Sequence, residues 1–252
     1  MFRALRLSVR QYRADASGLS GEYGAANAKS GPTLAFEVDA AIDAAVRDGF
    51  AGQVAIMRGG ALIYGRAAGY ADLDGKIPVT DETLFHVASL TKYFTAALAL
   101  KAAEEGRLSL DDEASAMFSG TPLDKRDFTI GDLLSHRSGL RSTYAAEEMN
   151  DPASAIDAIA AANKDNLKDG AFHYSNDSYD LIAILLERIY GEPYEAVFRR
   201  KLAAPARLQR YGFWGEAALS DPRGRGQPLI AQSAALMKRN YGMIGSAGLL
   251  IT

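Results

Sequence analysis

The order of hydrophobic and polar positions predicts a helix, then two strands, then a long stretch dominated by helices. From Thr33 apolar residues recur every three or four positions, which predicts an amphipathic helix that ends at Gly49. Two apolar stretches, QVAIM and ALIYG, follow, and Gly59 and Gly60 lie between them. Because glycine tolerates a positive φ, this pair predicts a β-hairpin. The apolar helix face comprises Leu34, Val38, Ala41, Ile42, Ala45 and Val46.

Four further helices are predicted along the rest of the chain. They cover residues 90–105, a segment that begins at 129 and breaks at Gly139, a segment that begins at 152, and about 177–190. Thr129 with Asp132 forms a variant of the capping box, and Pro152 occupies a first helical position where its missing N–H is harmless. After residue 190 strand signals are weak, and SAGLLIT at the end of the sequence is one of the few candidates.

Residues 1–32 are expected to form an N-terminal extension and linker. Residues 14–32 are rich in Gly, Ala and Ser. The first stretch, MFRALRLSVRQYR, is basic, and its arginines interrupt the apolar run that a secretory signal needs. A frayed extension is the simpler interpretation, and a transit-like or membrane-surface helix is the alternative. No apolar run in the sequence approaches the ~20 residues needed to span a bilayer.

The amino-acid composition excludes several kinds of chemistry and of partner. The 252 residues are 48% hydrophobic and 23% charged, which is typical of a globular protein of one large or two small domains. A net charge of −3 argues against a nucleic-acid partner. The chain has no cysteine, which excludes disulfides and thiolate catalysis. The three histidines lack the spacing of a metal site, so we expect no metal and no cofactor. The oligomeric state stays open.

A serine and a lysine three positions apart, Ser89 and Lys92, are the first candidate for chemistry. On a helix these positions share a face, near the positive end of the helix dipole. A serine hydroxyl needs a base within hydrogen-bond reach, and a lysine can serve when it is held neutral. The alternative is that Ser89 caps the helix and Lys92 is a solvated surface charge.

The surroundings of this pair resemble the serine β-lactamase and penicillin-binding protein superfamily, and within it the class C-like esterases and D-peptidases. The resemblance covers most of residues 35–252 in the family's order. Its segments are AGQVAIMRGGALIYGRAAGYAD, LFHVASLTKYFTAALALKAAEEGRLSLDD, FTIGDLLSHRSGL, FHYSNDSYDLIAILLERIYGEPY and GSAGLLIT. It implies an α/β (α+β) fold in which an antiparallel sheet has flanking helices, in a single domain over 33–252 with a mostly helical region at about 108–235.

The resemblance also implies roles for individual residues. Ser89 would attack a carbonyl and form an acyl-enzyme, and Lys92 would accept its proton or tune its neighbour. Tyr174 would act as base or proton relay, and Asn176 would hydrogen-bond Lys92 and the substrate. The histidines at 86, 136 and 173 would be structural. No metal or organic cofactor is implied, and the family is often exported, although a cytoplasmic location is the default from the sequence.

The sequence departs from the family in one respect. A third motif, Lys-Thr-Gly or His-x-Gly, is absent, so we expect a truncated domain without its C-terminal strands. The resemblance implies that the missing strand supplies one N–H of the oxyanion hole. Losing one oxyanion donor typically costs a factor of ~10² to 10³ in rate, so little hydrolysis is expected from these 252 residues alone. Two interpretations follow. One is a serine hydrolase acting on a small-molecule or peptide substrate at an ester, amide or β-lactam carbonyl. The other is a non-catalytic relative or fragment that binds a ligand or partner.

Overall fold

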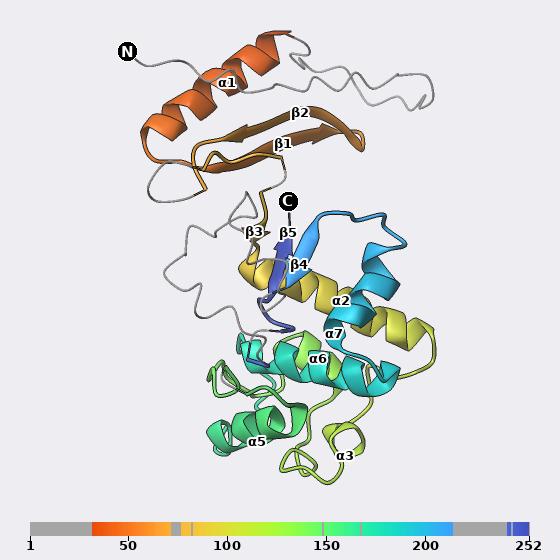
Figure 1. Ribbon diagram of the computed structural model, residues 1–252. Helices are drawn as coiled ribbons and strands as arrows, with labels where there is room; N and C mark the ends of the chain where they lie inside the picture. Colours follow the sequence, from red (N-terminus) through yellow and green to blue (C-terminus); the bar gives the residue numbers. More distant parts are fainter. Residues whose placement is uncertain are drawn as a thin grey trace. The chain divides into compact units, whose positions relative to one another are not determined.

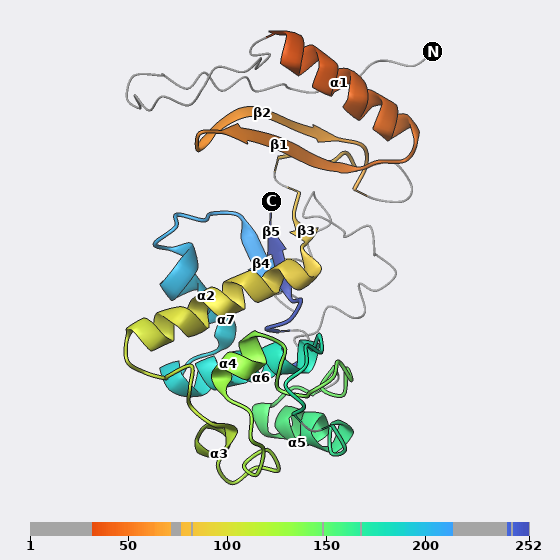
Figure 2. The ribbon, with the colours of Figure 1, turned by 180° about the vertical axis from the view of Figure 1, so that it is seen from behind.

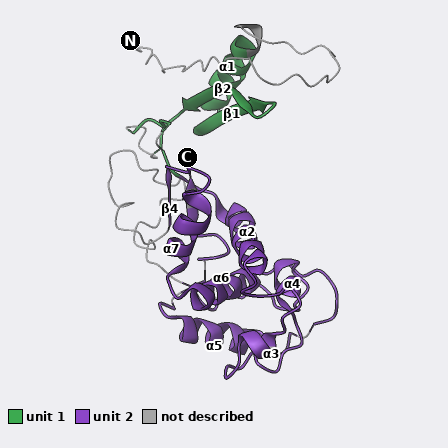
Figure 3. Cartoon of the chain, turned by 90° about the vertical axis from the view of Figure 1, so that its right-hand side faces the viewer, with its two compact units in different colours: residues 1–84, 221–232, 252 green, residues 85–220, 233–251 purple. Residues whose placement is uncertain are grey.

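The computed structural model describes residues 32–71, 77–81, 83–147, 149–166, 168–213, 241–242 and 244–251. Most of the predicted N-terminal extension, residues 1–31, lies outside the described residues, as do residues 214–240 of the predicted helical region. The described residues form two compact units, one up to Leu84 and one from Phe85 onward (Figure 3).

The first unit is a helix packed on a hairpin. Helix α1 (Pro32–Arg47) lies along one face of the antiparallel strands β1 (Gly52–Arg58) and β2 (Ala61–Ala68) (Figure 1). Gly59 and Gly60 join the strands with φ of 57° and 80°, a combination that glycine adopts without strain. The predicted helix and hairpin are therefore confirmed.

Apolar contacts and one polar cluster hold this helix on the hairpin. Ile42 of α1 packs against Tyr64 and Ala68 of β2. The Tyr64 hydroxyl donates a 2.7 Å hydrogen bond to Asp39, and Arg66 pairs with the same carboxylate at 3.0 Å. Burial, together with the Asp39 carboxylate, raises the pKa of Tyr64 to about 12. The phenol therefore stays a neutral donor at any physiological pH.

The second unit is built around helix α6 (Asn176–Tyr190). Its residues 181–186 are buried on every side, as expected for the central helix of a domain. Its main contacts are with helices α2 (Thr91–Glu104), α4 (Ile130–Leu134), α5 (Pro152–Ala162) and α7 (Tyr194–Phe198). Helix α3 (Ala114–Met117) is a short turn, and Figure 2 shows this arrangement from behind.

A small antiparallel sheet completes the second unit. Its strands are β3 (Phe85–His86), β5 (Leu249–Ile251) and β4 (Tyr211–Phe213), in that spatial order. Phe85 pairs with Ile251, and Phe213 pairs with Leu249. Strand β5 is the weak candidate at SAGLLIT. Its pairing with β3 brings the last described residues beside the start of α2, where the candidate serine lies.

The predicted helix boundaries carry the expected caps. Thr129 and Asp132 form the capping box of α4, and Asp151 caps α5, whose first residue is a proline. Gly191 ends α6 with φ of 69°. Within the described ranges, no helix combines the length and the apolar character needed to cross a membrane.

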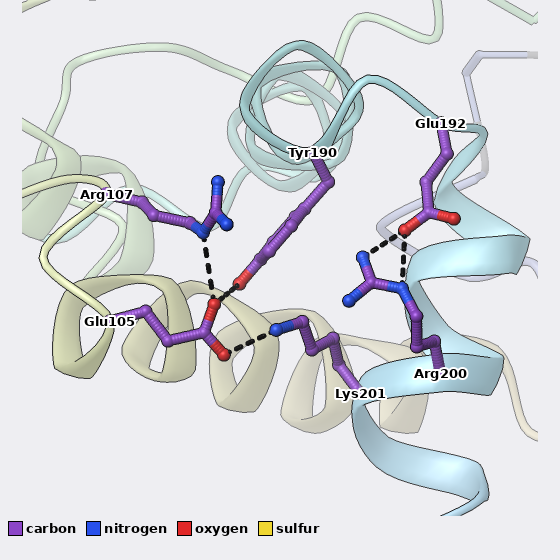
Figure 4. A network of polar contacts seen from close by, with 6 residues as sticks. All are labelled: Glu105, Arg107, Tyr190, Glu192, Arg200 and Lys201. Carbon is purple, nitrogen blue, oxygen red and sulfur yellow. Dashed lines mark hydrogen bonds and ion pairs between the residues drawn. The ribbon is translucent and has the colours of Figure 1, made fainter.

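A polar cluster ties together the C-terminal ends of α2 and α6 and a single π-helical turn, η2 (Arg199–Ala203) (Figure 4). The carboxylate of Glu105 accepts from Lys201 at 2.6 Å and from the Tyr190 hydroxyl at 3.1 Å. Three cations lie 5.0 to 5.3 Å from the centre of the Tyr190 ring, namely Arg107, Arg200 and Lys201. These contacts complement the packing of α6 against α2.

Candidate active site

The candidate serine lies in a strained turn at the start of α2. Ser89 is exposed in a 3₁₀ turn, η1 (Ala88–Leu90), that leads directly into the helix. The residue before it, Ala88, has φ of 46°, a left-handed conformation that is unfavourable for alanine. Such strain is found most often at functional sites. No side chain caps η1 or α2, so the interpretation of Ser89 as a helix cap is wrong.

Lys92 lies one turn further along, with its amine directed at Ser89. It is only 6% exposed, which rules out the alternative of a solvated surface charge. Its Nζ donates to Ser89 Oγ at 3.3 Å, to Asn176 Oδ1 at 2.6 Å and to the main-chain carbonyl of Ser246 at 3.0 Å. Three acceptors match the three N–H donors of an ammonium group, which explains how the amine is accommodated in a largely buried place.

Tyr174 and Asn176 come from the segment that opens α6. The Tyr174 hydroxyl donates a 2.6 Å hydrogen bond to Ser89 Oγ. Ser175, not Asn176, caps the helix, since its side chain accepts from the Ser178 amide. The Asn176 side chain is therefore available to accept from Lys92. The structure thus brings together all four residues that the sequence singled out.

The segment before α6 is held by a histidine and a serine. His136, with φ of 60°, accepts from the Ser175 amide through Nδ1 at 3.1 Å, and its carbonyl accepts from the His173 amide at 2.7 Å. The Asn176 amide donates to Ser142 Oγ at 2.7 Å. Burial, with the Lys92 charge as a further cause, lowers the pKa of His136. Its ring is neutral at physiological pH, and its two hydrogen bonds hold the segment before α6.

The first turn of α6 is fixed by a buried carboxylate. Asp177, only 2% exposed, accepts from the amide and hydroxyl of Thr143 at 3.1 and 2.5 Å and from Asn163 Nδ2 at 2.9 Å. Three hydrogen bonds to charged oxygens compensate for burying the carboxylate. This network orients the helix end from which Tyr174 and Asn176 project.

An open pocket of about 560 Å³ lies at Ser89. Its walls are largely apolar or aromatic, and Lys92 and His136 are the basic side chains that line it. The lining residues are Val87, Ser89, Leu90, Lys92, Tyr93, Ala96, His136, Tyr174 and Tyr179. The Lys92 Nζ lies 4.8 Å from the Tyr174 ring centre and 5.6 Å from that of Tyr179, so aromatic faces also shield the amine. Among the described residues no cluster of three or more metal-ligating side chains occurs.

Sequence reasoning missed the third partner of Lys92. The Ser246 carbonyl belongs to the main chain, and no letter of the sequence identifies a carbonyl as functional. The segment GSAGLLIT was recognised as a weak strand candidate and as part of the resemblance, and neither assigns a role to that carbonyl. The signal available in the sequence was indirect, namely the glycine at position 245. The structure explains that glycine, because a Cβ atom there would lie 2.2 Å from the Tyr179 carbonyl oxygen of α6.

Comparison with known proteins identifies the family. A family model described as Beta-lactamase matches residues 38–251, most of the chain. The chain belongs to the Beta-lactamase family. The resemblance inferred from the sequence is confirmed, and so is the α/β fold class, since the described helices and antiparallel strands match solved members of this superfamily.

Relatives of the Beta-lactamase family include proteins with different activities. The chain is 29% identical over 168 residues to a putative penicillin-binding protein, PbpX, from Bacillus subtilis (strain 168), covering 66% of this chain and 42% of that protein. It is 25% identical over 191 residues to a teichoic acid D-alanine hydrolase from Staphylococcus aureus (strain MRSA252), covering 76% and 48%. The chain therefore spans about half the length of the curated relatives it matches.

A solved structure supports the same assignment. An octameric penicillin-binding protein homologue from Pyrococcus abyssi superposes with a TM-score of 0.67 and 26% identity, covering 86% of this chain and 53% of that one. The shared fold therefore extends over most of this chain.

Proposed function

We propose that this Beta-lactamase family chain is a serine hydrolase that acts through an acyl-enzyme at Ser89. The observation that carries the proposal is the surroundings of Ser89 Oγ. This oxygen is exposed at the pocket and lies 2.6 Å from the phenol of Tyr174 and 3.3 Å from the amine of Lys92. A serine becomes a nucleophile when a proton acceptor is within hydrogen-bond reach, and the Tyr174 oxygen is such an acceptor once the phenol has given up its own proton beside the Lys92 ammonium.

Acylation would proceed by proton transfer within this group. In the reactive form the pair formed by Tyr174 and Lys92 lacks one proton, with Tyr174 as phenolate beside the Lys92 ammonium. Ser89 Oγ attacks the carbonyl carbon, its proton passes to the Tyr174 oxygen, and the carbonyl π electrons move to the carbonyl oxygen. Collapse of the tetrahedral intermediate breaks the bond to the leaving alcohol or amine, which takes the proton. A water molecule then attacks the acyl-serine ester and delivers a proton to the same pair. The bond between the acyl carbon and Ser89 Oγ breaks, Oγ takes that proton, and the acid leaves.

Lys92 and Asn176 would support this transfer. The Lys92 ammonium lies where negative charge develops on the two oxygens, and a fixed charge of this kind needs no reorganisation during the reaction. Asn176 holds that amine in place through a 2.6 Å hydrogen bond and is expected to contact the substrate as well. Holding the reacting groups in the correct orientation before the reaction lowers the entropic part of the activation barrier.

The proposed substrates carry an ester, amide or β-lactam carbonyl. A pocket of about 560 Å³ is in the usual range for small-molecule sites and suits a small molecule or the end of a peptide. The names of the relatives point to different compounds: one is a teichoic acid D-alanine hydrolase and another is a putative penicillin-binding protein. Since the chain spans about half their length, the substrate is a proposal at the level of the carbonyl class.

The test is covalent labelling of Ser89. The folded chain is incubated with a fluorophosphonate or with a labelled penicillin, and its intact mass is measured. We expect a mass increase of one adduct that Ser89→Ala abolishes. Ser135→Ala, which changes another exposed serine, is the matched control and keeps the adduct. A folded chain that gains no adduct would support the non-catalytic, ligand-binding interpretation.

A further inference from the structure

The segment that supplies the third partner of Lys92 is held by side chains from several elements. Asp180 of α6 accepts from the amides of Gly245 and Ser246 through one oxygen, at 3.2 and 3.0 Å. Thr95 of α2 donates to the Gly245 carbonyl at 2.7 Å. Beyond Ser246, the His86 Nε2 donates to the Ala247 carbonyl. The main chain on both sides of the Ser246 carbonyl is therefore fixed.

One peptide group within this segment is held from both sides. The peptide that joins Gly245 to Ser246 presents its carbonyl to Thr95 and its N–H to Asp180. Thr95 is itself fixed by the buried hydroxyl of Tyr194, 2.7 Å away. With this peptide plane fixed, the direction of the next carbonyl, that of Ser246, depends only on the two backbone torsions of Ser246. That carbonyl accepts from Lys92 at 3.0 Å.

Asp180 is in the right place to do this because of helix geometry. It lies one turn after Asn176 on the same face of α6. The segment reaches it because Gly245 has no side chain: a Cβ atom there would lie 2.7 Å from the Ala183 side chain, one turn further along. Asn176 and Asp180 therefore act on the same amine, one by direct contact and one through the main chain.

The burial of Asp180 needs an explanation that packing does not give. The side chain is 1% exposed, and the helix residues that follow it, 181–186, are all apolar. Burial raises its pKa well above the ordinary range, which shows how unfavourable an ionised carboxyl is in this place. An apolar side chain would avoid that cost, and two amide donors are the compensation visible in the structure.

We propose that Asp180 is a positioning residue: by accepting from the Gly245 and Ser246 amides it aims the Ser246 carbonyl at Lys92 and so holds the amine beside Ser89. The inference deepens the proposed function, because it rests on the role given there to Lys92. Asp180 touches neither Ser89 nor a substrate.

Two variants separate the acceptor role from simple packing. Asp180→Asn keeps an acceptor oxygen, whereas Asp180→Ala removes it. Hydrogen exchange of the Gly245 and Ser246 amides and acetylation of the Lys92 amine are measured in both, with Lys101 as the internal reference amine. Losing hydrogen bonds of this kind shifts the equilibrium between the ordered and the loosened segment by about 10- to 100-fold. In Asp180→Ala we expect amide exchange and Lys92 acetylation to rise by about that factor, and in Asp180→Asn to stay near wild type.

A control separates local loosening from lower stability. Ile156→Ala removes a fully buried side chain of α5 and should lower the urea midpoint without changing the reactivity of Lys92 relative to Lys101. If Asp180→Ala does not fold, Thr95→Val tests the same peptide from its other side and should also raise Lys92 acetylation. Wild-type Lys92 reactivity in a folded Asp180→Ala or Thr95→Val variant, or Asp180→Asn behaving as Asp180→Ala, would overturn the proposal.

Labelling of Ser89 in the same samples distinguishes this inference from the proposed function. If wild type is labelled by a fluorophosphonate, Asp180→Ala should be labelled more slowly, by about 10-fold or more, with Asp180→Asn restoring the rate. If wild type is not labelled while exchange and acetylation change as expected, the proposed hydrolase activity fails and the positioning of Lys92 by Asp180 still holds.

Discussion

Replacing Tyr174 with phenylalanine removes a single oxygen atom from the site and leaves the rest of the side chain in place. That oxygen lies 2.6 Å from Ser89 Oγ. The ring, which stacks on His136 with centres 4.6 Å apart, is unchanged. The substitution therefore separates proton transfer from packing.

The two effects should differ greatly in size. Proton transfer by a positioned side chain contributes about 10² to 10⁴ in rate, or about 3 to 5 kcal/mol of activation free energy. Tyr174 is 47% exposed, so its hydrogen bond should contribute about 1 kcal/mol or less to folding. We expect acylation of Ser89 to slow by about 10²-fold or more while the thermal midpoint changes by a few degrees at most.

The assay is the rate at which an intact-mass adduct forms on Ser89 with a labelled penicillin or a fluorophosphonate, measured beside a thermal melt. Tyr144→Phe is the matched control, since Tyr144 is an exposed tyrosine that does not line the pocket. It should label at the wild-type rate. A Tyr174→Phe variant that labels as fast as wild type would refute a role of the phenol in proton transfer.

Three further outcomes are expected. Asp177→Ala removes the acceptor of three hydrogen bonds, two from the half-buried Thr143 and one from the buried Asn163, and should lower the free energy of unfolding by about 3 kcal/mol, measured by urea titration. Ala88→Gly should leave stability unchanged or raise it by up to about 1 kcal/mol because φ is 46° there, whereas Ala97→Gly within α2 should lower it by about 1 kcal/mol. The hydrogen bond from Lys201 holds the pKa of Glu105 below its ordinary value, so the ionised carboxylate stabilises the folded state above that value. Thermal midpoints measured as the pH falls through the acid range should therefore decline less in Glu105→Gln than in wild type; an equal decline would contradict this role.

Local signals in the sequence were sufficient for the helices and the hairpin. Periodicity located α1, α2 and α6, and N-cap residues located the first residues of α4 and α5. Each of these signals lies within a few residues of the sequence. The strands β3, β4 and β5 have only two or three residues each. They arise from pairing between distant segments, such as Phe85 with Ile251, which periodicity cannot detect.

The residues of the candidate site also divide into those that local spacing predicts and those that depend on packing between distant segments. Ser89 and Lys92 could be paired from their spacing, since residues three apart share a helix face. Tyr174 and Asn176 came from the family resemblance, because their approach to Ser89 depends on how α6 packs against α2. The contribution of Asp180 could not be predicted. It acts on main-chain amides far along the chain, and an aspartate on a helix gives no sign of that.

The close approach of Gly245 to α6 has a consequence for evolution and engineering of this chain. The third ligand of the lysine ammonium is a carbonyl that every amino acid carries, so exchanging the side chain at 246 cannot delete it. Substitutions should instead be poorly tolerated at position 245, where even a methyl group would push the backbone away from helix α6. In a saturation library, the least permissive position near the lysine would then be the one residue that brings no functional group of its own.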